Sequence, residues 1–287
     1  MFFNKFIFFK IKGGLGNQLF IYFSAYYLAK KLKKKALFST DFFFTKQRSV
    51  VLDKLFYRDL EIIKFHKINK NFYKLPPILD KIIFLIFSRI LTSSYYSRID
   101  NVSFDEKNFN KKYLYYDFHF IDFRHLIKYR PSIRKIINFD NIKQRKIVSN
   151  LEKCKKNKKK IVMIHVRRGD TIKAKGYFVS LNYYQKAMKF FKNLNVQFVL
   201  FSDSPIWCSR QDIFKNLTII KENDAAKTLI MMKLCDHFII SNSTLSCWAA
   251  FLGEKKNSII IYPDPSFIGH SYLQSTLFLK NWIGLKY

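Results

Sequence analysis

The sequence predicts an α/β fold with a parallel, doubly wound sheet in the second half of the chain. Short apolar runs with the length of buried strands alternate there with segments that have the period of helices. The expected strands are 161–166, 196–201, 218–220, 237–240 and 258–262, and the expected helices are 182–192, 224–234 and 244–252. A strand, a glycine turn and a helix also open the first half of the chain.

Local signals set the ends of several of these elements. Asp224 stands where a side chain can cap the N-terminus of the helix that follows it. Gly253 is expected as the residue just after the end of the helix 244–252, and Pro263 is expected to stop the last strand. A final helix at 271–280 could pack back across the first half.

Composition narrows the class of protein. The chain has 287 residues, of which 49% are hydrophobic, so it can build the core of one large domain or of two ordinary ones. Its formal net charge of +32 predicts attraction to polyanions, but the lysines are spread widely and form no single basic motif. The four cysteines form no C-x-x-C pair, which indicates reduced thiols in a cytosolic protein and no zinc site.

The first half begins with a strand at 6–11, a glycine turn at 13–16 and a helix at 18–33, whose buried face repeats at helical spacing in Leu19, Phe20, Phe23 and Tyr27. Such a turn can aim backbone N–H groups at an anion. It lacks the G-x-G-x-x-G spacing of dinucleotide sites, and a merely tight structural turn is the alternative.

The remainder of the first half is less regular. A strand is expected at 37–41, a helix at 52–63 and a strand region at 113–123. The apolar segment 78–91 has cationic flanks and is either a membrane-interface helix or a buried or lid helix. The lysine-rich segment 144–160 marks the boundary between two domains, 1–150 and 151–287.

Three loops should meet at the carboxyl edge of the second sheet, where open α/β sheets bind ligands. The first loop carries His165, Arg167, Arg168 and Asp170, the second follows the strand 196–201, and the third spans 241–246 and opens a helix. Two guanidinium groups, several hydroxyls and a helix N-terminus suit a diphosphate, and Asp203 in the second loop suits a ribose or a base. The alternative is a surface turn in which Arg and Asp pair with each other. Carboxylates are few and isolated here, so no metal ligands are predicted.

Four motifs of this sequence, at 13–20, 165–170, 201–203 and 242–248, resemble in order and rough spacing those of the α-1,2-fucosyltransferases of glycosyltransferase family 11. The resemblance spans nearly the whole chain. It implies a GT-B fold, in which two Rossmann-like domains face each other across a cleft and the C-terminal domain, 151–287, binds the donor. The N-terminal domain, 1–150, would then lie on the acceptor side.

The resemblance also implies the reaction. L-Fucose would pass from GDP-β-L-fucose, with inversion and without metal or other cofactor, to the 2-hydroxyl of a galactoside. The acceptor would belong to a surface glycan such as a lipopolysaccharide O-antigen and could be lipid-linked. Four positions depart from the family pattern and leave the acceptor more open than the donor: Ile21, Thr171, Ser204 and Cys247.

Site residues follow from the same resemblance. Arg168 would grip the pyrophosphate, with Arg167 and His165 beside it, and Asp203 would bind the nucleoside. Two further groups would reach the phosphates, the loop residues Asn242, Ser243, Thr244 and Ser246 and the N-terminal turn residues Gly14 and Asn17.

In the chemical step, Arg168 is expected to stabilise the departing GDP. Asp170 is the candidate general base and His165 the second candidate, while an N-cap or an arginine partner is the alternative role for Asp170.

Two rival functions are a related transferase with another donor sugar and a basic protein that binds nucleic acid or another polyanion. We expect no nucleic-acid partner, because the charge does not cluster and the two site loops would stay unexplained. The positive charge fits better with a cytoplasmic enzyme attached peripherally to an anionic surface, the inner face of the inner membrane, through 78–91.

Overall fold

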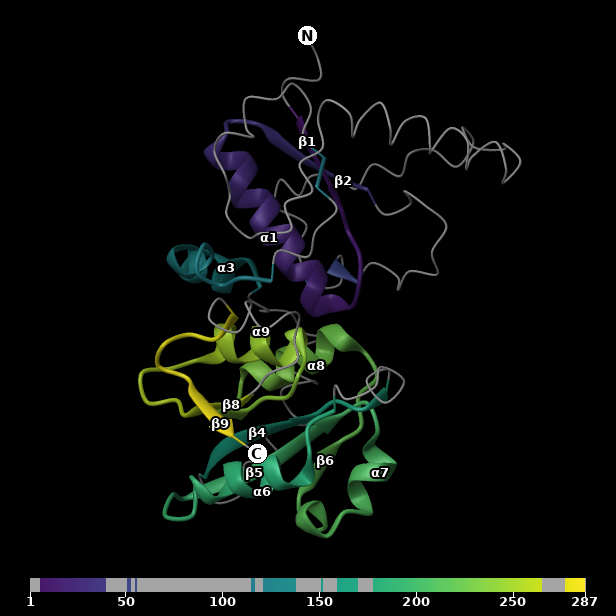
Figure 1. The fold of residues 1–287 in the computed structure, drawn as a ribbon, viewed down its shortest axis with the longest axis vertical. Helices are drawn as coiled ribbons and strands as arrows, with labels where there is room; N and C mark the ends of the chain where they lie inside the picture. The colour runs from purple at the N-terminus through teal and green to yellow at the C-terminus, as the bar shows by residue number, and fades with distance from the viewer. Residues whose placement is uncertain are drawn as a thin grey trace, which may run out of the picture. The chain divides into compact units, whose positions relative to one another are not determined.

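The computed structural model describes residues 6–39, 51–52, 55, 115–116, 121–137, 151, 159–169, 178–264 and 277–286. The chain divides into two compact units (Figure 1). The first contains Met1–Val50 and Tyr57–Phe120, and the second contains Val51–Phe56 and Ile121–Tyr287. Each unit is α/β, as predicted.

The first unit contains a parallel sheet whose strands have the order β2-β1-β3. Its elements are β1 (Phe6–Lys10), α1 (Leu15–Lys31), β2 (Lys35–Ser39) and β3 (Tyr115–Tyr116). The helix begins at Leu15, three residues earlier than predicted, because the extended residue Gly14 is its N-cap. The predicted buried face of this helix, Leu19, Phe20, Phe23 and Tyr27, is confirmed.

The second unit contains a six-stranded parallel sheet with the order β6-β5-β4-β7-β8-β9. Its strands are β4 (Lys160–Val166), β5 (Val196–Ser202), β6 (Thr218–Ile220), β7 (His237–Ile239), β8 (Ile260–Asp264) and β9 (Ile283–Lys286). The chain runs outward from β4 to β6 and then returns to the other side of β4. The strand order therefore reverses between β4 and β7, which is where dinucleotide-binding folds of this order hold their ligands.

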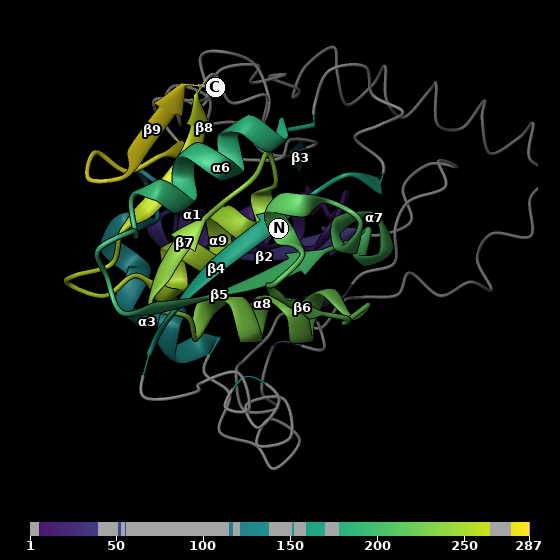
Figure 2. The ribbon, with the colours of Figure 1, turned by 90° about the horizontal axis from the view of Figure 1, so that it is seen from below.

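Helices cover both faces of this sheet. They are α3 (Arg130–Ile136), α6 (Leu181–Lys189), α7 (Pro205–Ser209), α8 (Ala225–Lys233) and α9 (Thr244–Gly253), with short 3-10 turns η5 (Ile127–Tyr129) and η7 (Asp212–Phe214). Figure 2 shows α6 on one face, while α8 and α9 lie on the other. The central strand β4 is buried from Ile161 to Val166, as its β-branched residues predicted. Among the described residues, no helix is long and apolar enough to cross a membrane.

The division between the units falls at residue 120, before the predicted boundary at 150, because residues 121–137 pack on α9. Phe123 stacks on Phe251 with ring centroids 4.2 Å apart, and Arg130 forms an ion pair with Glu254. The strand region expected at 113–123 is limited, in the described residues, to Tyr115–Tyr116. The segments 78–91 and 271–276 lie outside the described residues, as do 144–150 and 152–158 and most of 52–63.

Two expectations about element ends in the second unit were wrong. Gly253 is the last residue of α9, and a Cβ on it would come within 2.4 Å of the Lys233 carbonyl oxygen, so close helix packing requires the glycine. Strand β8 continues through Pro263, which is possible because its pairing with β7 ends at Ile261. Of the predicted helix 271–280, the structure describes only 277–280; Leu277 is helical, and the chain then leads into β9, which pairs with β8 in the second unit.

Candidate functional site

The carboxylate of Asp203 organises the loop that follows β4. β4 and β5 are in register from Lys160 and Val196 to Val166 and Ser202, so the residues after both strands meet at one edge. Asp203 Oδ1 accepts the backbone N–H of Arg168 at 2.9 Å, and Oδ2 accepts the N–H of Gly169 at 3.0 Å. Oδ2 also lies 2.9 Å from Arg167 Nη1. The first two predicted loops therefore meet as expected.

Glycine is required at position 169 by this close approach. A Cβ there would lie 2.8 Å from Asp203 Oδ2, which is closer than real Cβ contacts. The arginine–aspartate pair that sequence analysis left open does form, but its acid is Asp203. Each carboxylate oxygen has two lone-pair directions, so Asp203 keeps capacity for a ligand hydroxyl or base N–H while it holds the loop.

The guanidinium group of Arg168 stacks on an aromatic ring that sequence analysis missed. Arg168 Cζ lies 3.6 Å from the centroid of Trp207 in α7, and both side chains are half-buried. Pro205 opens that helix, and Trp207 is its third residue. Because the stacked N–H groups point outward in the plane of the guanidinium, the ring fixes a planar fork of donors. The only sequence signal was an aromatic residue soon after the Asp203 loop.

His165 joins the end of β4 to the end of β7. Its Nδ1 atom is hydrogen-bonded to Ser241 Oγ at 2.9 Å, and its carbonyl accepts the hydroxyl of Tyr184 at 3.1 Å. Burial, assisted by the charge of Arg167, lowers the pKa of His165 to about 3. A neutral, buried imidazole with this pKa is a poor general base near neutral pH. The geometry favours a positioning role for His165.

The third predicted loop, which connects β7 to α9, also reaches this edge. Ser243 is the N-cap of α9, and its backbone N–H donates to the Ser241 carbonyl at 2.7 Å. The Ser246 hydroxyl is buried and donates to the Ser243 carbonyl at 3.0 Å, so Ser246 shapes the loop from within. Asn242 and Thr244 are half-buried beside it, and the first N–H groups of α9 have no partner within the helix.

The two predicted residues of the first unit lie at the N-terminus of α1. Gly13 adopts a positive φ of 76°, and Gln18 Nε2 donates to its carbonyl at 2.9 Å, which closes the turn. Gly14 is the N-cap, and the half-buried Asn17 lies in the first turn of the helix, against Gly13. The turn therefore lies at a helix N-terminus, where backbone N–H groups have no partner within the helix, and its role in anion binding stays a prediction.

Asp170 lies outside the described residues, so its role as general base stays a prediction. The same holds for metal independence. Among the described residues, no three His, Cys, Asp or Glu side chains gather into a possible metal site.

The two α/β units, with the parallel strand order of the second sheet, define the GT-B class of glycosyltransferase folds. The chain belongs to glycosyl transferase family 11, whose family model matches residues 6–286. The resemblance seen in the four motifs is thereby confirmed. The family assignment favours an enzyme over the nucleic-acid-binding alternative.

Similar proteins include two from Escherichia coli. The O-antigen biosynthesis glycosyltransferase WbnK is 26% identical, over 96% of this chain and 99% of that protein. An alpha-1,2-colitosyltransferase is 24% identical, over 90% of this chain and 91% of that protein. A galactoside alpha-(1,2)-fucosyltransferase 2 from Sus scrofa is 28% identical, over 44% of this chain and 41% of that protein.

Solved structures support the fold. The fucosyltransferase NodZ from Bradyrhizobium covers 87% of this chain and 93% of its own, with a TM-score of 0.51 and 16% identity. The NodZ alpha-1,6-fucosyltransferase soaked with GDP-fucose gives a TM-score of 0.53 at 16% identity, with 87% of this chain and 92% of that chain covered.

Proposed function

We propose that this enzyme transfers L-fucose from GDP-β-L-fucose to the 2-hydroxyl of a galactoside in a bacterial surface glycan such as an O-antigen. The observation that carries the proposal is the Asp203 carboxylate, which holds Arg167 and the backbone of Arg168 at the switch point of the sheet. The names of the O-antigen enzyme WbnK, the colitosyltransferase and the galactoside fucosyltransferase support the reaction class.

In this proposal the site holds the GDP pyrophosphate by charge and by backbone dipoles. The Arg168 fork, fixed on Trp207, binds phosphate oxygens, and the first turn of α9, after its N-cap Ser243, supplies backbone N–H groups. Arg167 adds a second positive charge that Asp203 holds in place. These groups stabilise the negative charge that grows on GDP as it departs.

The transfer proceeds in one displacement. The acceptor hydroxyl oxygen attacks C1 of fucose while the bond from C1 to the phosphate oxygen breaks, and GDP leaves with the electron pair. Attack from the opposite face converts the β-linked donor into an α-linked product. The acceptor proton passes to Asp170, the remaining candidate base, because burial makes His165 unsuitable. No metal ion or other cofactor takes part in the proposed reaction.

Calorimetry with GDP and GDP-fucose in EDTA tests the donor. The wild-type protein should bind both without metal. Arg168→Ala should abolish detectable binding and lower turnover by on the order of 10²–10³. Lys192→Ala is the matched control, because it removes one exposed positive charge at the opposite, amino edge of the same sheet. Equal binding by Arg168→Ala and Lys192→Ala would overturn the donor-site assignment.

The acceptor and the base need separate assays. Incubation with GDP-fucose and a panel of galactosides, followed by NMR of the product linkage, should show an α-1,2 bond. Asp170→Asn should retain GDP binding and lose most turnover. Nearly full activity in Asp170→Asn would remove Asp170 as the base.

A different donor sugar is the second candidate, and the alpha-1,2-colitosyltransferase relative favours it. Colitose is fucose without its 3-hydroxyl, so the same pyrophosphate site would serve both donors. Competition between GDP-fucose and GDP-colitose in the transfer assay decides between them.

A further inference from the structure

The turn between α6 and β5 exposes two large apolar side chains. Phe190 is 46% exposed and Leu194 is 45% exposed. The turn is nevertheless well ordered, since the backbone N–H of Phe190 donates to Ala187 at 3.2 Å and that of Leu194 to Phe191 at 3.0 Å. The opposite face of α6 and the Phe191 ring are buried in the core. The fold is therefore anchored by other residues and does not need this apolar pair.

Lysines surround the two apolar side chains. Lys189 and Lys192 are exposed on α6 and its turn, whereas Lys186 donates to the Lys286 carbonyl at the end of β9, at 3.5 Å. The exposed Lys160 at the start of β4 lies beside the turn, because its backbone N–H donates to the Asn195 carbonyl at 3.3 Å. The sequence contains no acidic residue between positions 178 and 202.

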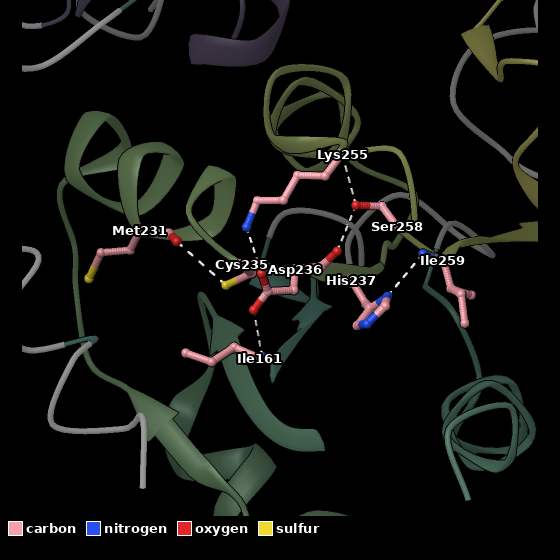
Figure 3. Close-up of polar contacts among 8 residues, drawn as sticks. All are labelled: Ile161, Met231, Cys235, Asp236, His237, Lys255, Ser258 and Ile259. Carbon is pink, nitrogen blue, oxygen red and sulfur yellow. Dashed lines mark hydrogen bonds and ion pairs between the residues drawn. The ribbon is translucent and has the colours of Figure 1, made fainter. Parts of the chain in front are cut away.

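The nearby acid at this edge is already engaged. Figure 3 shows Asp236, at the start of β7, between two partners: Lys255 Nζ at 2.5 Å and the backbone N–H of Ile161 at 2.9 Å. Ser258 also donates to the Asp236 carbonyl, at 2.7 Å. The lysines around the apolar pair therefore keep an excess of positive charge.

We propose that this surface, Phe190 and Leu194 with Lys189, Lys192 and Lys160, attaches the enzyme to an anionic lipid membrane. Apolar side chains in a ring of lysines match acyl chains below anionic headgroups. A duplex nucleic acid offers phosphates but no apolar surface for Leu194. A second copy of the chain would meet the same charge, and the net charge of +32 opposes that contact.

The geometry has a consequence for the substrate. The patch lies at the amino edge of the sheet, whereas the donor loops lie at the carboxyl edge. The seven residues of β4 separate these edges by about 23 Å. A glycan acceptor carried by a lipid would therefore have to extend several sugar units from the bilayer. The attachment itself does not depend on the proposed reaction.

Vesicle co-sedimentation of the full-length protein tests the attachment. Vesicles of phosphatidylcholine with phosphatidylglycerol should bind the wild-type protein, and vesicles of phosphatidylcholine alone should not. Lys189→Gln with Lys192→Gln should weaken binding by on the order of 25-fold, about fivefold for each charge. Phe190→Ser with Leu194→Ser should also weaken it at least several-fold.

Matched controls distinguish attachment through this patch from nonspecific attraction by other exposed charges or apolar side chains. Lys221→Gln with Lys227→Gln removes two exposed lysines, one just after β6 and one in α8. Phe178→Ser removes a side chain that is 48% exposed near the other end of α6. Both controls should bind vesicles like the wild type, and every variant should retain its circular dichroism spectrum and GDP binding.

Three results would overturn the proposal. The first is that neither vesicle type retains the wild-type protein. The second is that the test pairs and the control variants weaken vesicle binding equally, which would place the attachment elsewhere, such as at 78–91. The third is single-stranded RNA binding that depends on Phe190 and Leu194 while vesicle binding does not.

Discussion

Replacement of Asp203 by asparagine removes one negative charge and keeps the size of the side chain. The carboxylate accepts two backbone N–H groups, at 2.9 and 3.0 Å, and an arginine N–H at 2.9 Å. The asparagine carbonyl can serve only one side of this arrangement. With the amide oxygen in the place of Oδ2, its NH2 group would face the backbone N–H of Arg168. In the other orientation, the NH2 group would face both the N–H of Gly169 and the guanidinium group of Arg167.

The expected loss follows from these contacts. A hydrogen bond to a charged group contributes about 1.5–3 kcal/mol, and a partly exposed ion pair at most about 1 kcal/mol. The Asp203 side chain is 23% exposed, so solvent screening keeps the contribution of its ion pair with Arg167 near the low end of this range. The loop conformation should lose about 2–3 kcal/mol. Since each 1.4 kcal/mol is tenfold in affinity, GDP binding should weaken about 30-fold to 100-fold.

Calorimetry with GDP and with inorganic pyrophosphate measures this effect and identifies its cause. If Asp203 acts by holding the arginines, Asp203→Asn weakens the binding of both ligands. If it acts only through the nucleoside, pyrophosphate binding is unchanged. Asp212→Asn is the control, because Asp212 is an exposed carboxylate in the same unit. GDP and pyrophosphate affinities within twofold of wild type in Asp203→Asn would refute the reasoning.

Three further predictions concern the second unit. The free energy of unfolding should fall by about 2 kcal/mol as the pH is lowered from about 6.5 to about 5, on account of His165. A pKa of about 3 keeps the imidazole neutral in the folded protein, whereas the imidazole of the unfolded chain binds a proton over this range. Urea unfolding should show that His165→Asn lacks this part of the pH dependence. Trp207→Leu should weaken GDP binding about threefold to tenfold, whereas Trp207→Phe should retain most of it in calorimetry. Gly253→Ala should cost about 1–3 kcal/mol in thermal unfolding, because its Cβ would meet the Lys233 carbonyl at 2.4 Å; Gly284→Ala, whose Cβ would meet the side chain of Tyr262 and no backbone atom of a packed helix, should cost less.

Each of these predictions has a clear contrary result. An unchanged pH slope in His165→Asn would mean that the imidazole can be protonated in the folded protein. Equal GDP affinity in Trp207→Leu and wild type would show that the stacked ring does not position Arg168. An unchanged melting temperature in Gly253→Ala would mean that α8 and α9 can separate at no cost.

The sequence predicted the elements with strong local signals. The apolar run of β4 and the N-cap at Asp224, whose Oδ1 accepts the N–H of Ala226 at 2.8 Å, are both confirmed. The meeting of the three loops was also predictable, because parallel strands place their carboxyl ends at one edge. Local pattern and topology together therefore located the candidate donor site.

The contact partners of individual side chains could not be predicted, because they depend on how the helices and strands are oriented in space, which the order of residues does not specify. The stack of Trp207 on Arg168 needs the exit angle of α7, and the Asp203 clamp needs the register of β4 with β5. Strand β9 was missed because its short run, 283–286, gains its stability from pairing with β8 and carries little local signal. Long-range pairing, which residue order does not show, decided all three features.

Strand β9 also matters for biosynthesis. It covers the edge of β8 from Ile261 to Asp264, and that edge stays open until β9 pairs. Open edges recruit other chains, so copies of this protein in which β9 has not yet paired should be the most aggregation-prone species during synthesis. Expression yield should therefore respond sharply to loss of residues 283–286, even though they lie away from the Asp203 clamp.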